Sequence, residues 1–116
     1  MSREPSLYLA DIEESCSLIL QYTGGMTGDE FRADRKTVDA VVRNLEVIGE
    51  AVKHLPARSR AQRADVDWRR IAGFRDILIH AYFGVDLDIV WDVVANKIPA
   101  LLAAVMDLQR MGAPKR

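Results

Sequence analysis

The stretch at residues 67–83 reads DWRRIAGFRDILIHAYF, and the rest of the chain is organised around it. Four side chains that could take part in catalysis or binding lie within one mostly apolar segment. They are Arg75, Asp76, His80 and Tyr82. Burying an arginine, an aspartate or a histidine is costly unless the group is paired. We therefore expect this segment to be a helix that carries a functional site.

Local signals before this stretch predict helices and no strands. Apolar residues recur at helical spacing over residues 5–23 and again from residue 35 to about residue 55. Proline suits the first turn of a helix, glycine suits its end, and a hydroxyl followed three residues later by a carboxylate forms a capping box. The boundary residues are Pro5, Gly24-Gly25, the box Thr27–Glu30 before a short helical turn, Asp34 as the next N-cap, and Pro56 as its stop.

The central stretch and the segment after it carry boundary signals of the same kind. Asp67 caps the central helix and Gly84 closes it. Asp86 caps the last helix, and Pro99 bends that helix because proline removes one backbone hydrogen bond. The polar residues 56–66 are expected to form a loop with room for one helical turn.

Length and composition are those of one globular domain. The chain has 116 residues, of which 49% are hydrophobic and 28% are charged,. The expected fold is all-α, an antiparallel bundle of four to five helices with its core at residues 5–108 and a short C-terminal tail. Cys16 is the single cysteine, so no intrachain disulfide can form, and its place on an apolar stripe predicts a core residue,.

The sequence predicts a cytoplasmic protein with no membrane partner. No apolar run approaches the roughly 20 residues of a membrane span. The N-terminus leads into no stretch that resembles a signal peptide.

Charge is unevenly distributed although the net charge is only −1. Between Lys53 and Arg75 there are seven basic and two acidic residues, a local balance of 7 − 2 = +5. Such an arc can hold a phosphate backbone. On charge alone, a solvated arginine-rich loop is the simpler interpretation. The basic residues are Lys53, Arg58, Arg60, Arg63, Arg69, Arg70 and Arg75.

Helical geometry constrains how the candidate residues can act together. Asp76 and His80 are four residues apart and share a face, so the carboxylate can orient the imidazole. Arg75 and His80 are five apart, roughly 140° around the helix axis. Either the helix ends or bends near His80, or two chains contribute to one cleft, which predicts a homodimer with composite sites.

These residue types suit phosphodiester cleavage in RNA. A histidine can take the proton of a 2′-hydroxyl or protonate the leaving oxygen, and a guanidinium can stabilise charge on the phosphoryl oxygens. No metal site, cofactor site, phosphate-binding glycine loop or catalytic serine motif is found. Glycine at position 49 predicts close helix packing, and Glu50 beside it can face an arginine. The structural alternative is that Arg75 pairs with Asp76 or Glu50, His80 caps a helix end and Tyr82 packs.

Several motifs in a fixed order resemble one known family. They are RNLEVIGEA at residues 43–51, DWRRI at 67–71, RDILIHAY at 75–82, DIVW at 88–91 and KIPALL at 97–102. Together they resemble the HEPN superfamily, and within it the HepT-like toxin family once filed as DUF86. The resemblance covers roughly residues 5–108.

The resemblance implies a homodimeric helical bundle that acts as a metal-independent endoribonuclease. It implies the toxin of a type VII HEPN/MNT system, partnered by a minimal nucleotidyltransferase antitoxin, MntA. The catalytic arginine and histidine match Arg75 and His80 in a cleft between protomers, with Glu50 and Asp76 as supporting residues. The motif tyrosine, Tyr82, is the residue to which the antitoxin transfers AMP. Asp76 departs from the asparagine common there, and would pair with Arg75, or raise the proton affinity of His80, and repel RNA phosphates.

Three functions therefore compete. The first is a ribonuclease toxin, and the second is a non-catalytic HEPN subunit that binds the nucleotidyltransferase or presents Tyr82 to it. The third is a plain dimeric bundle whose polar cluster only pins the interface.

Overall fold

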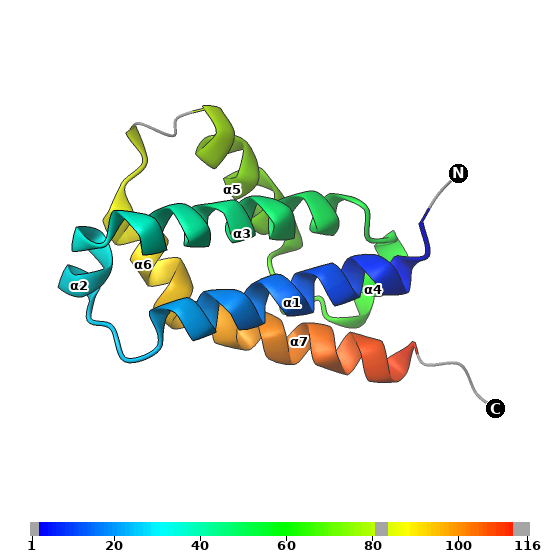
Figure 1. Cartoon of the computed structure of the whole chain (residues 1–116). Coiled ribbons are helices and arrows are strands. Elements are labelled where there is room, and N and C mark those ends of the chain that lie inside the picture. Colours follow the sequence, from blue (N-terminus) through cyan, green and yellow to red (C-terminus); the bar gives the residue numbers. More distant parts are fainter. Residues whose placement is uncertain (1–2, 81–83, 113–116) are drawn as a thin grey trace.

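The computed structural model describes residues 3–80 and 84–112, and within these ranges every regular element is a helix (Figure 1). The all-α prediction is confirmed. Five helices have ten residues or more, and two have six. They are α1 (Pro5–Thr23), α2 (Gly28–Ala33), α3 (Arg35–Lys53), α4 (Ala57–Gln62), α5 (Trp68–His80), α6 (Leu87–Asn96) and α7 (Ile98–Met111).

Three long helices form an antiparallel layer. α1 packs against α3 on one side and α7 on the other, and runs opposite to both (Figure 1). α5 crosses α3 and has its main packing there, while α6 reaches α2 and α7. α5 is therefore held chiefly by one neighbour.

The helix boundaries follow local chemistry, as predicted. The capping box is complete: the amide of Glu30 donates to the Thr27 hydroxyl at 3.1 Å, and the amide of Thr27 donates to the Glu30 carboxylate at 2.8 Å,. Asp34 accepts from the Thr37 amide, and its pKa is lowered chiefly by the side-chain hydrogen bond from Thr37. After α1 the backbone turns at Gly25, whose φ of 79° favours glycine,.

Two boundaries differ from the predictions. The loop over 56–66 contains the helix α4, which buries none of its own residues and so gave no apolar periodicity to read. The last helix is two helices, α6 and α7, which meet at Lys97 with a bend of 46°. Pro99 lies in the first turn of α7, so the predicted bend is present,.

The core is built mainly from α1, α3 and α7, and α2, α5 and α6 add buried side chains to it. Cys16 is fully buried there, and burial raises the pKa of its thiol to about 12, so it is a packing residue as predicted,. The largest fully buried side chains are Phe31, Ile12, Ile19, Ile48, Leu78 and Ile98.

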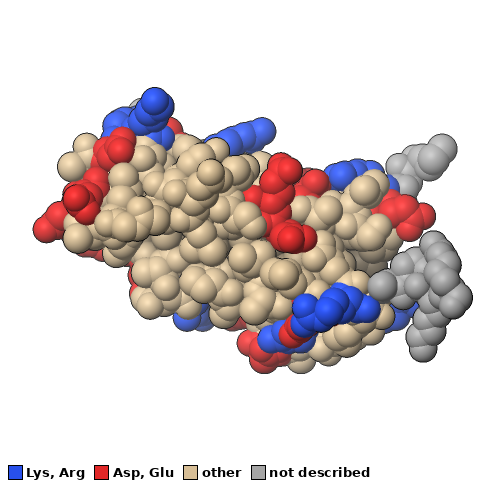
Figure 2. Space-filling model, turned by 60° about the horizontal axis from the view of Figure 1, so that its bottom comes forward, with Lys and Arg blue, Asp and Glu red and all other residues tan. Residues whose placement is uncertain are grey.

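Within the described ranges, no single helix is long and apolar enough to cross a membrane. α6 and α7 reach that length and composition only as a bent pair, and many of their apolar residues belong to the core. Seen from the side of α1 and α7, the surface has a broad area without acidic or basic side chains, and side chains of both charges border it (Figure 2).

Candidate functional site

The site begins where α5 lies against α3 at a mid-helix glycine. A Cβ atom at Gly49 would lie 2.4 Å from the Cβ of Arg75 and 3.3 Å from the carbonyl oxygen of Ile71. Real side chains do not approach so closely, which confirms the prediction of close helix packing. Gly49 lets the two helices touch and sets the position of Arg75.

Arg75 is paired with two carboxylates. Its Nε lies 3.1 Å from Oε1 of Glu50 on α3, and its Nη1 lies 3.3 Å from Oδ1 of Asp76. The prediction that Glu50 faces an arginine is thus confirmed as geometry. The Arg75 side chain remains 25% exposed, so the guanidinium is anchored without being sealed from solvent.

Glu50 also belongs to a second set of contacts. The imidazole Nε2 of His54 lies 3.0 Å from Oε2 of Glu50. This hydrogen bond, and then the positive charge of Arg75, lower the pKa of the Glu50 carboxyl,. Glu50 therefore stays ionised and able to hold Arg75 over a wider pH range than an isolated glutamate.

The outer part of this network was missed by the sequence analysis. The His54 ring stacks on Tyr8 of α1, with ring centroids 4.9 Å apart and an interplanar angle of 11°. The guanidinium carbon of Arg3 lies 4.6 Å from the centre of the Tyr8 ring,. The stack joins residues that are 54 − 8 = 46 positions apart in the sequence, so no local spacing predicts it.

A groove of about 250 Å³ runs beside Arg75 between α1, α3 and α5. Opposite charges line it, so it does not present one sign of potential. The side chains that matter for the site are Tyr8, Arg43, Glu46, Glu50, Arg75 and Ile79.

His80 is exposed at the end of the described part of α5. Its Nδ1 lies 2.8 Å from the main-chain carbonyl oxygen of Asp76. A carbonyl can only accept, so Nδ1 carries the hydrogen, and Nε2 of the neutral ring is left as a proton acceptor. The expectation that the Asp76 carboxylate orients the imidazole is wrong, because that carboxylate is turned to Arg75 while the helix backbone takes its place.

Neither of the two pockets found among the described residues is lined by both Arg75 and His80. The groove includes Arg75 and Ile79 but not His80. Tyr82 lies outside the described residues. Among the described residues, no group of three or more His, Cys, Asp or Glu side chains could hold a metal ion.

α5 leaves apolar surface uncovered next to these groups. It buries only Trp68 and Leu78, while Ile77 is 57% exposed and Ile79 is 44% exposed. Because the two isoleucines are two residues apart, they lie on different sides of α5, so apolar side chains are exposed on more than one side of this helix,.

Comparison with known proteins adds a family and several relatives. The family model described as "Ribonuclease HepT-like" matches residues 12–108. "Putative RNase MJ0127" of Methanocaldococcus jannaschii is 50% identical over 92 residues, which cover 79% of this chain and 76% of that protein. "Probable ribonuclease HepT" of Thermococcus cleftensis is 44% identical over 101 residues, covering 87% of this chain and 92% of that protein.

A third relative extends the match along nearly the whole of both chains. "Putative RNase TTE0752" of Caldanaerobacter subterraneus is 40% identical over 106 residues, covering 91% of this chain and 95% of that protein. No solved structure matches the chain significantly.

Proposed function

The chain belongs to the ribonuclease HepT-like family, and from that premise we propose that it is a metal-independent endoribonuclease whose catalytic residues are Arg75 and His80. One observation carries the assignment of roles. The Asp76 carbonyl fixes the proton of His80 on Nδ1 and leaves Nε2 free to act as a base,.

In the proposed reaction, Nε2 of His80 takes the proton of a ribose 2′-hydroxyl. The 2′ oxygen then attacks the adjacent phosphorus, and the bond from phosphorus to the 5′ oxygen breaks. The 5′ oxygen leaves as a hydroxyl after it takes a proton from water, the resulting hydroxide takes the proton held by His80, and the other fragment keeps a 2′,3′-cyclic phosphate. The guanidinium of Arg75 stabilises the charge on the phosphoryl oxygens.

The reaction requires a second protomer, because Arg75 and His80 point to different sides of α5. The exposed side chains of Ile77 and Ile79 support a homodimer that covers this helix. In that dimer a cleft at the interface brings the arginine of one chain toward the histidine of the other.

The proposed partner is an MntA-like nucleotidyltransferase antitoxin that transfers AMP from ATP to Tyr82. Tyr82 follows His80 by two residues. An added phosphate so close to His80 would repel the RNA backbone, which is a direct physical route to silencing.

The alternative function is a non-catalytic HEPN subunit that binds the nucleotidyltransferase. One observation favours it: Arg75 already has two carboxylate partners, Glu50 and Asp76, and these offset its charge. In that case Arg75 and His80 would serve only to shape a docking surface for the partner.

Purified wild-type chain, His80→Ala and Arg75→Ala test the two functions with a single-stranded RNA in the presence of EDTA. Loss of a general base lowers rates by about 10²–10⁴-fold, which we expect for His80→Ala, and loss of a group that stabilises developing charge lowers them by about 10²–10³-fold, which we expect for Arg75→Ala. Circular dichroism and light scattering check that fold and dimer survive. Cleavage that persists in His80→Ala would overturn the assignment, and a wild type that binds the nucleotidyltransferase without cleaving RNA would favour the alternative.

Asp76→Asn gives a gain-of-function control in the same assay. It removes a carboxylate that competes with RNA phosphate for Arg75. We expect faster cleavage if Arg75 contacts the substrate, and no change if the arginine is only structural.

A further inference from the structure

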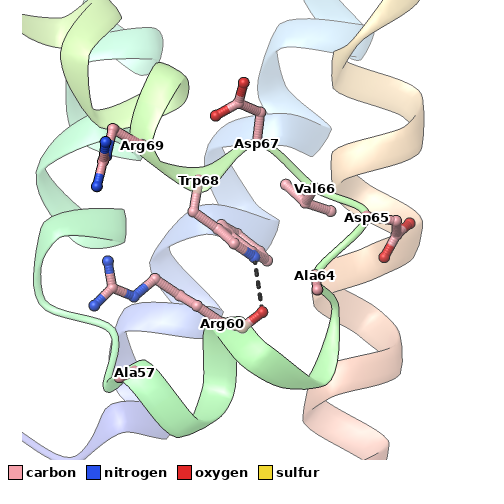
Figure 3. A pocket seen from close by; sticks show the side chains of 8 residues that line it. All are labelled: Ala57, Arg60, Ala64, Asp65, Val66, Asp67, Trp68 and Arg69. Atoms are coloured by element: carbon pink, nitrogen blue, oxygen red, sulfur yellow. Dashed lines mark hydrogen bonds between the residues drawn. The ribbon is translucent and has the colours of Figure 1, made fainter.

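A second pocket lies between α4 and the start of α5, away from the groove that contains Arg75. It has a volume of about 510 Å³ (Figure 3). Its wall combines two arginines, two aspartates, an indole and small apolar side chains. The lining residues used here are Arg60, Asp65, Asp67, Trp68 and Arg69.

Arg60 and Arg69 bring positive charge to this pocket that no carboxylate of the described residues neutralises through an ion pair. Their guanidinium groups lie on the same side of Trp68 (Figure 3). The Nε atom of Arg60 is buried and has no hydrogen-bond acceptor among the described residues. A buried donor without an acceptor is costly, so an external acceptor would be favoured.

The two aspartates of the pocket are already engaged. Asp65 pairs with Arg63 at 2.8 Å. Figure 3 shows Asp65 on the opposite side of Trp68 from Arg60 and Arg69. Asp67 accepts from the Arg70 amide at 3.1 Å and lies 3.6 Å from Arg70 Nε. The pocket is therefore suited to an anion with several oxygen acceptors.

Trp68 keeps the pocket in shape. Its side chain is almost fully buried, and its indole N–H donates to the carbonyl oxygens of Arg60 at 3.2 Å and Arg63 at 3.0 Å. These bonds tie the end of α4 to the start of α5. Arg60 and Arg69 are thus carried by segments that are fixed to each other before any ligand arrives.

The pocket is aligned with His80 along α5. Arg69 and His80 are eleven residues apart, which places them about 20° apart around the axis and roughly 16 Å apart along it. Gly73 lies between them on the same exposed face, and a Cβ atom built there would meet nothing within 4 Å. A glycine inside a helix costs about 1 kcal/mol relative to alanine, and no described residue packs against Gly73 closely enough to require it.

We propose that Arg60 and Arg69 form a second RNA contact, in which they hold a backbone phosphate a few nucleotides from the phosphate at His80. The strand would lie along the exposed face of α5 and pass close to the helix backbone at Gly73. Asp76 also lies on this face, but its carboxylate is paired with Arg75. The inference rests on the proposed function, because it takes RNA as the ligand of that face.

The test measures binding separately from cleavage. Full-length His80→Ala protein is titrated into a fluorescent single-stranded RNA by anisotropy over a series of salt concentrations, with and without Arg60→Gln/Arg69→Gln. One lost phosphate contact lowers the slope of log affinity against log salt by about 0.7 for single strands. We expect that reduction and an affinity loss on the order of tenfold.

Arg58→Gln is the matched control. Arg58 belongs to the same short helix and also has no ion pair among the described residues, but it does not line the pocket. Arg69→Gln alone guards against a folding defect, because Arg69 is exposed. An unchanged slope in the double variant would overturn the proposal, as would an equal loss in Arg58→Gln, which would indicate a diffuse charge effect.

Two further arms separate the possible outcomes. If inorganic phosphate binds in a manner that depends on both arginines while RNA affinity does not, the pocket serves free phosphate and the RNA contact is refuted. If the wild type does not cleave RNA but binds it with the expected dependence on both arginines, this inference stands and the proposed catalytic function fails.

Discussion

α3 and α5 cross at Gly49, yet they use their residues in different ways. α3 buries eight of its nineteen residues, whereas α5 buries two of its thirteen. α3 is covered by α1 on one side and α5 on the other, but α5 packs mainly on α3 alone. α3 therefore serves as scaffold, whereas α5 leaves most of its side chains at least partly exposed, Ile77 and Ile79 among them.

The mid-helix glycines make the same contrast at two single positions. Gly49 has no room for a side chain because Arg75 fills the space, and Gly73 has open space around it. Gly49 is required for a contact within the fold, whereas Gly73 is required only if another molecule approaches the helix there. The following substitutions break or sharpen this contrast.

The largest effect is expected for the core of α3. Ile48 is 1% exposed, and Ile48→Ala should lower the free energy of unfolding by about 2–5 kcal/mol, measured by urea denaturation. Ile77→Ala on α5 is the control, because an exposed position changes monomer stability by about 0.5 kcal/mol or less. Sedimentation should instead show that the proposed dimer is weaker for Ile77→Ala, and an unaltered dimer would contradict the role given to α5.

Gly49→Ala should destabilise the protein although alanine is the better helix former. The new methyl group would force Arg75 and α5 away from α3, at an overpacking cost of about 1–3 kcal/mol,. Cleavage should fall as well, because the pair between Arg75 and Glu50 is displaced. Thermal melting together with RNA cleavage measures both, and a stabilised, fully active Gly49→Ala would refute the packing argument.

Gly73→Ala should change the stability in the opposite direction from Gly49→Ala. It should stabilise the fold by about 1 kcal/mol through helix propensity alone, while it weakens RNA binding because a methyl group stands in the path of the strand. Melting and anisotropy on the same preparation give the two numbers. Loss of the dimer, rather than of RNA binding, would mean that the partner protomer occupies this strip.

The smallest effect concerns how the stability contributed by the pair of Glu50 and Arg75 depends on pH. Because the pKa of Glu50 is lowered in the fold, its contribution to stability is fully present above the ordinary value of 4.5 and is lost as pH falls through the lower folded value,. Near pH 7, the free energy of unfolding of the wild type should therefore exceed that of Glu50→Gln by at most about 1 kcal/mol, since the pair of Glu50 and Arg75 is partly exposed. The difference should shrink below pH 4.5, and melting curves from pH 3 to 7 would show it.

The predictability of these regions differed for physical reasons. Helix ends at Thr27, Asp34, Asp67 and Asp86 were predictable because a cap acts on amides within three residues of itself,. The segment that forms α4 was expected to be a loop with at most one helical turn, because α4 buries none of its residues and so shows no apolar periodicity. The split between α6 and α7 was anticipated only as a bend at Pro99.

In the site, the contact of Glu50 with Arg75 could be anticipated because Gly49 announced a close approach. The carbonyl partner of His80 could not, because a main-chain acceptor leaves no mark on the sequence. The stack of His54 on Tyr8 and the pocket at Arg60 depend on tertiary packing, for which spacing gives no signal.

The single thiol in the core has a practical consequence. Cys16 is fully enclosed and weakly acidic, so an alkylating reagent can reach it only when α1 separates from its neighbours,. The rate of its modification under native conditions therefore reports how often the scaffold opens, and no label has to be engineered into the chain. Measuring the alkylation rate of Cys16 with and without RNA would show whether a ligand bound to α5 reduces the opening of α1, a helix that the ligand does not contact.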